Sequence, residues 1–139
     1  MFEECIYFNL NALARDLNRL WERHFTEVDL SPPLGYLLMA VLQEPGRSQR
    51  DLAEVLQLER STITRFLETL ESRGLIRRES TSADARISHV FPTEKGLALR
   101  PRLNRVLRNI QAELEARMQG SEIPTLLKVT AKLKRSLKT

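Results

Sequence analysis

The stretch that decides the fold runs from Ser48 to Gly96. It reads SQRDLAEVLQL over 48–58, ERSTITRFLETLESRGLIRR over 59–78 and, after Glu79, STSADARISHVFPTEKG over 80–96. Apolar residues recur at helical spacing in a short run, then in a longer run, and finally in two extended runs separated by small polar residues. This order predicts a helix, a tight turn, a longer helix and a β-hairpin, which together form a winged helix-turn-helix.

Two helices make up the first part of this stretch. Ser48 followed three residues later by Asp51 is typical of a helix start, so the first helix should begin at about Gln49. The second helix carries one apolar face and, near its amino end, small or hydrogen-bonding residues that fit close to base edges in a major groove. The predicted apolar positions are Leu52, Ala53 and Leu56, then Leu58 in the turn, then Ile63, Phe66, Leu67 and Leu70.

The polar residues of these helices are candidates for DNA contact. Arg60 and Gln49 stand at helix starts, where phosphate contacts are more common than base contacts. An ordinary solvated helix face would carry similar residue types, but the hairpin that follows favours a DNA-reading helix. We expect four residues of the second helix to face base edges: Ser61, Thr62, Thr64 and Arg65.

The hairpin is the predicted wing. Gly74 suits the left-handed end of the second helix, and an extended run begins directly after it. The segment TSADAR (81–86) cannot contribute to a core and therefore forms the tip, with apolar residues on the return strand. Arg86 at the tip can enter the minor groove, and Asp84 can orient its guanidinium through a charge-assisted hydrogen bond.

Several of these motifs resemble those of the MarR family of winged helix-turn-helix transcriptional regulators. They are STITR (61–65), LESRGLIRR (70–78), the Asp-x-Arg pattern of 84–86 and VFPTEKG (90–96). The resemblance covers the winged region motif by motif and the flanking helices only by layout. It implies a DNA-binding homodimer, more often a repressor than an activator. It also implies a small aromatic or anionic effector, held between the dimer helices and the winged region. In this chain the corresponding place is a crevice beneath Trp21.

The regions outside the winged part are expected to be helical. Residues 2–26 contain no Gly or Pro and carry an apolar stripe at alternating steps of four and three, and a buried helix over 34–42 follows. After the wing, one helix is expected from Thr93 to about Met118, with Pro101 as its only interruption. A last helix is expected from about Glu122 to Leu137.

Apolar helices at both ends of the chain indicate a two-fold dimer. The alternative is a monomer in which these helices fold back into one core. On the dimer interpretation, the chain is mainly α-helical with a small antiparallel sheet of two or three strands. It divides into an amino-terminal dimerisation helix (1–30), a winged DNA-binding domain (31–96) and carboxy-terminal dimerisation helices (97–139).

Composition limits the classes of function. The 139 residues are 42% hydrophobic and 29% charged with a net charge of +4, which fits a soluble domain with an anionic partner. No apolar run approaches the roughly 18 residues of a membrane-spanning helix, and the amino terminus is not a basic signal start, so we expect a cytoplasmic protein. One Cys and two His allow neither an intrachain disulfide nor an ordinary four-ligand zinc site, and no cofactor is expected.

Two alternatives stay open at this point. Cys5 stands near the start of the first helix, where some MarR-type regulators carry a peroxide-sensing cysteine, but Glu3 and Glu4 beside it disfavour the reactive thiolate. The other alternative is a winged-helix module that binds protein. The arginines around the motif favour DNA instead. No Gly-rich phosphate loop, nucleophile elbow or carboxylate pair indicates an enzyme.

Overall fold

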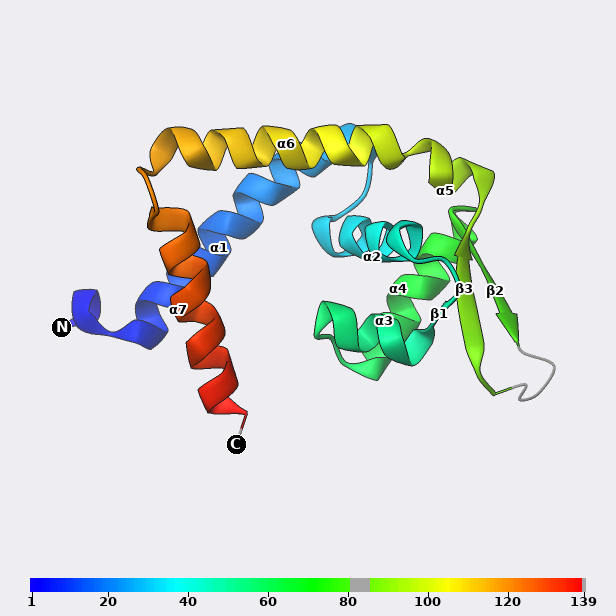
Figure 1. Ribbon diagram of the computed structural model, residues 1–139, viewed down its shortest axis with the longest axis horizontal. Helices are drawn as coiled ribbons and strands as arrows, with labels where there is room; N and C mark the ends of the chain where they lie inside the picture. The colour runs from blue at the N-terminus through cyan, green and yellow to red at the C-terminus, as the bar shows by residue number, and fades with distance from the viewer. Residues whose placement is uncertain (81–85, 139) are drawn as a thin grey trace. The chain divides into compact units, whose positions relative to one another are not determined.

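The computed structural model describes residues 1–80 and 86–138 and is mostly helical with one small sheet (Figure 1). It consists of two compact units, Met1–Val106 and the residues from Leu107 onward, which we describe separately. The first contains α1 (Ile6–Phe25), α2 (Pro32–Gln43), β1 (Arg47–Ser48), α3 (Gln49–Leu56), α4 (Arg60–Ser72), β2 (Ile76–Ser80), β3 (Ser88–Pro92) and α5 (Glu94–Ala98). Helix α6 (Arg100–Arg117) begins in the first unit and ends in the second, where α7 (Glu122–Leu137) follows. The predicted fold class is confirmed.

The helix-turn-helix forms as predicted. Helix α3 begins at Gln49, and the Ser48 hydroxyl accepts a hydrogen bond from the backbone N–H of Asp51 at 3.1 Å. Gln57 ends α3 in the left-handed conformation, with φ of 56°. The buried residues of α4 are Ile63, Leu67 and Leu70. Phe66 and Leu58, predicted as buried, are only partly covered, because both lie at the margin of the core.

The wing is a three-stranded antiparallel sheet in the order β1-β3-β2. The hairpin strands β2 and β3 pair Ile76 with Pro92 at one end and Ser80 with Ser88 at the other. Strand β1 had no sequence signal of its own, since two residues are too short for a period. It pairs Arg47 with Val90 on the other side of β3, and Gly46 donates to the carbonyl of Val90 at 2.8 Å.

Two glycines permit the close packing that places the winged helices. A Cβ on Gly35 would lie 2.3 Å from Cε1 of Phe25, a fully buried side chain at the end of α1. A Cβ on Gly96 would lie 2.2 Å from the carbonyl oxygen of Leu75. Because neither approach leaves room for a larger side chain, α1 and α5 are fixed closely against the winged core.

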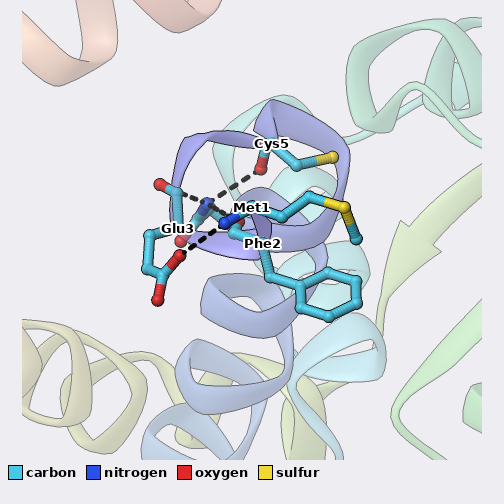
Figure 2. Close-up of polar contacts among 5 residues, drawn as sticks. Met1, Phe2, Glu3 and Cys5 are labelled. Carbon is cyan, nitrogen blue, oxygen red and sulfur yellow. Dashed lines mark hydrogen bonds and ion pairs between the residues drawn. The ribbon is translucent and has the colours of Figure 1, made fainter.

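The sequence predicted one continuous helix from Phe2, but the structure has a break before α1. A 3-10 turn spans Phe2–Glu4, and Cys5 is extended (φ −92°, ψ 115°) before α1 begins. The Asn9 side chain holds this break, because its amide donates to the carbonyls of Phe2, Glu3 and Cys5 at 3.0, 3.1 and 2.8 Å. Figure 2 shows the turn, with the amino terminus bonded to the Glu3 carboxylate. The backbone N–H of Cys5 donates to the carbonyl of Phe2 at 3.1 Å.

The helix predicted from Thr93 to Met118 is divided into α5 and α6. Thr93 caps α5 through its hydroxyl, which accepts from the N–H of Gly96 at 3.1 Å. The division falls at Leu99, two residues before Pro101, which has no N–H to continue the helical bonding of the preceding turn. Helix α2 begins at Pro32 rather than Leu34, since prolines are well accommodated in a first turn. The bounds of α7 are those predicted.

Candidate DNA-binding surface

The amino-terminal half of α4 presents polar side chains on the surface of the first unit. Arg60, Ser61 and Arg65 are exposed, and Thr62 is half-buried. Glu59, at the N-cap, makes no side-chain hydrogen bond to the first turn, so the backbone N–H groups there have no side-chain cap. The positive end of the helix dipole adds to the charge of Arg60 at this point. The Glu59 carboxylate at the same N-cap offsets part of this positive potential.

Gln49 and Thr64, predicted as separate DNA contacts, bond to each other. The Gln49 amide donates to Oγ1 of Thr64 at 2.7 Å, and the Thr64 hydroxyl donates to the carbonyl of Arg60 at 2.9 Å. Since a hydroxyl has one hydrogen, Thr64 has no donor left for a base. The pair joins the start of α3 to the first turns of α4, which makes it a clamp within the motif.

A hollow of about 260 Å³ lies between α3, α4 and the wing. It gathers Gln49, Arg60, Thr64 and Arg86 from distant parts of the chain, together with Arg50 and Ser88, which the sequence analysis did not single out. Arg50 directly follows Gln49 at a helix start, so the argument made for Gln49 would have found it. Asp84, the predicted brace for Arg86, lies outside the described residues.

The two adjacent arginines of β2 face opposite sides, as their strand position predicts. Arg77 lies over the ring of Phe91, with 4.7 Å to the centroid, and forms an ion pair with Glu79. Arg78 donates to the Glu71 carboxylate at 2.9 Å, and this bond lowers the pKa of Glu71 below its ordinary value of 4.5, partly offset by desolvation. Both arginines are thus engaged in pairs within the winged region.

His89 of β3 is half-buried, and its Nδ1 lies 2.9 Å from the carbonyl oxygen of Gly46. The reason is strand β1, which covers that edge of β3.

The crevice expected beneath Trp21 is present. It has a volume of about 540 Å³, and its walls come from α1 and the start of α2: Leu17, Asn18, Trp21, Glu22, Ser31, Pro32, Pro33 and Tyr36. The Trp21 indole N–H donates to the Tyr36 hydroxyl at 3.0 Å, which orients both rings. The surface that lines the crevice is mainly apolar, and Asn18, Glu22, Ser31 and Tyr36 add polar groups, as in sites for small organic molecules.

Three other features bear on function: the single cysteine, metal-binding groups and membrane-spanning helices. Cys5 is exposed, and its role as a redox sensor stays a prediction. Within residues 1–80 and 86–138, no three His, Cys, Asp or Glu side chains are grouped as a metal ion would require. No helix in the same part of the chain is long and apolar enough to cross a membrane.

The chain is similar to proteins of the MarR family and to one HTH-type regulator. A MarR family model matches residues 28–87. The uncharacterized HTH-type transcriptional regulator YybA of Bacillus subtilis is 31% identical over 96 residues, which cover 69% of this chain and 64% of YybA. The matched part thus spans less than two thirds of that relative.

Solved structures of transcriptional regulators share the fold. The transcriptional repressor CouR, bound to a 23-mer DNA duplex, has a TM-score of 0.87 at 23% identity, over 95% of this chain and 94% of CouR. The Streptomyces coelicolor regulator PcaV, in complex with its natural ligand, has a TM-score of 0.88 at 23% identity, over 99% of this chain and 97% of PcaV. With the winged fold, the family model and the relative in agreement, the chain belongs to the MarR family.

Proposed function

We propose that this protein is a sequence-specific transcriptional repressor that binds duplex DNA as a homodimer. The observation that carries the proposal is the convergence of Arg60 and Arg86 with the polar amino end of α4 around one hollow. Helix α4 enters the major groove and the wing reaches the flanking minor groove. The proposed location is the cytoplasm.

The predicted contacts divide into three roles. Ser61, Thr62 and Arg65 read base edges, because they are exposed or half-exposed near the amino end of α4. Arg60 binds phosphate. Gln49 and Thr64 hold the first turns of α4 in place through their mutual hydrogen bond.

Dimerisation is proposed for residues 1–30 and 97–139. The amino half of α1 exposes large apolar side chains, among them Ile6 at 67% and Tyr7 at 80%. Two recognition helices must lie about 34 Å apart to reach successive major grooves on one side of the duplex. A dimer interface built from the terminal helices would set that distance.

An effector is proposed for the Trp21 crevice. Its apolar walls, the Tyr36 hydroxyl and a volume of about 540 Å³ fit a small aromatic molecule. PcaV, which shares the fold, is described with a natural ligand. Binding would alter DNA affinity if the ligand favours one arrangement of α1 and α2.

Base reading is tested with Arg65→Ala. An operator is first selected from random duplexes, and affinity is then measured on that operator and on random DNA at several salt concentrations. The variant should lose on the order of 1 to 3 kcal/mol on the operator and much less on random DNA. Arg77→Ala removes the same charge from β2, where the guanidinium is engaged with Phe91 and Glu79, and is the matched control.

Equal losses of Arg65→Ala on both DNAs would make Arg65 a phosphate contact. Wild-type protein that binds no duplex even at low salt would instead support the protein-interaction module.

A further inference from the structure

Arg73, at the carboxyl end of α4, reaches a distant turn. Its Nη2 donates to the backbone carbonyl of Asp29 at 2.6 Å and lies 3.3 Å from the Asp29 carboxylate. Asp29 ends the 3-10 turn Thr26–Val28, which directly follows α1, and it has a positive φ of 53°. The recognition helix is therefore bonded to the joint between α1 and α2.

The same turn is held from α6. The Arg102 guanidinium donates to the backbone carbonyl of Glu27, and Nε of Arg105 lies 3.5 Å from the Glu27 carboxylate. Residues 26–29 thus connect three elements: the end of α1, the end of α4 and the first turns of α6. Two of these bonds end on backbone carbonyls, so they depend on the conformation of the turn rather than on its side chains.

The two ends of α4 are held differently. At the amino end, the bond between Gln49 and Thr64 stays inside the helix-turn-helix. At the carboxyl end, the Arg73 carbonyl accepts from Lys95 at 2.9 Å, which ties it to α5. The Arg73 guanidinium connects α4 to the turn that α1 and α6 share. A charge-assisted hydrogen bond of this kind is stronger than a neutral one.

We infer that Arg73 is a positioning residue for operator recognition, which fixes the angle of α4 to α1 and α6 and so the distance between the two recognition helices of a dimer. This inference rests on the proposed function, in which a dimer reads two half-sites. It assigns to Arg73 no contact with DNA. Loss of the Arg73 side chain leaves each recognition surface intact, but the distance between the two recognition helices becomes more variable.

The test uses the selected operator and two versions with one base pair added or removed between the half-sites. One base pair changes the separation by about 3.4 Å and the facing by roughly 35°. Wild-type protein should bind both altered operators much more weakly than the original. In Arg73→Gln, this spacing penalty should shrink by about 2- to 30-fold, while affinity for a single half-site stays at the wild-type value.

Three variants sharpen the result. Arg73→Lys keeps the charge, so its spacing penalty should lie between those of Arg73→Gln and the wild-type protein. Asp29→Asn keeps the carbonyl acceptor and tolerates the positive φ, so its spacing penalty should be close to wild type. Arg78→Gln is the matched control, because it removes an arginine bond to α4 through Glu71 that does not involve the 26–29 turn.

An Arg73→Gln variant with an unchanged spacing penalty would overturn the inference. So would equal loss on all three operators and on the half-site, which would show only a damaged fold or a lost phosphate contact. Wild-type protein that binds the operator but ignores the spacing would instead contradict the dimer of the proposed function.

Discussion

Helices α4 and α7 carry the same kind of apolar stripe, but they differ in how much of it the chain covers. The apolar face of α4 is buried at Ile63, Leu67 and Leu70. In α7, none of the residues 122–137 is buried, and Leu127 is 65% exposed. Since the sequence pattern is alike, the difference lies in what surrounds each helix. The winged region completes its own core, whereas α7 requires cover from elsewhere, which we assign to a second copy.

Helix α1 shows the same contrast within one element. Its last residue, Phe25, is fully buried against Gly35, while Ile6 and Tyr7 at its start are largely exposed. The buried end belongs to the winged core and the exposed end behaves like α7. The boundary between the self-sufficient part and the dependent part therefore lies along α1, not at its end.

Removal of α7 is the strongest test of this contrast. A chain that ends before Glu122 should be monomeric or aggregated, because the apolar surface that α7 would share with a second copy loses its partner. Sedimentation over a range of concentrations measures the outcome. A clean, folded dimer of the shortened chain would show that α7 is not part of the interface.

Matched leucine substitutions compare the two stripes directly. Leu67→Ala in α4 should lower the free energy of unfolding by about 2 to 5 kcal/mol, because it leaves a cavity in a closed core. Leu127→Ala in α7 should have less effect on unfolding at high protein concentration and should mainly weaken dimerisation. Chemical denaturation at several protein concentrations separates the two effects. Equal losses of unfolding free energy in the two variants, independent of protein concentration, would contradict the view that α4 is covered within the chain and α7 by a second copy.

Local patterns predicted the parts of the fold that neighbouring residues determine. The cap at Ser48, the left-handed Gly74 and the bounds of α7 all depend on residues a few positions apart. The break at Cys5 escaped prediction, because it depends on one Asn9 amide that reaches three carbonyls. Helical periodicity carries no sign of such a bond.

The candidate site was predictable in outline but not in its internal bonds. The residue types and their place on α4 identified the surface that Arg60 and Arg65 share. The hydrogen bond from Gln49 to the Thr64 hydroxyl could not be predicted, since a sequence pattern does not show which polar side chains bond to each other. The bond between Arg73 and Asp29 joins positions 44 residues apart, which no local spacing reveals.

The wing should contribute a smaller, salt-dependent share of DNA affinity. Arg86→Ala should make the slope of log K against log salt shallower by about one contact per subunit, roughly two per dimer, with the largest loss on operators with A·T-rich flanks. Asp84→Ala should give a weaker form of the same defect. Wild-type affinity and an unchanged slope in both variants would show that the wing does not contact DNA, although the winged region would still have its complete core.

The smallest expected effect concerns the bond between α4 and β2. Because the Arg78 hydrogen bond lowers the pKa of Glu71 in the folded state, the unfolded chain binds more protons at acid pH. The stabilisation is therefore present above the ordinary pKa of 4.5 and is lost as pH falls through the lowered folded value. Both side chains are partly exposed, so Glu71→Gln should cost only about 0.2 to 1 kcal/mol near neutral pH. Denaturation at about pH 7 and about pH 3 measures the difference, which should close at the lower pH. A difference that stays constant between the two would assign the effect to packing of the side chain at the end of α4 rather than to its charge.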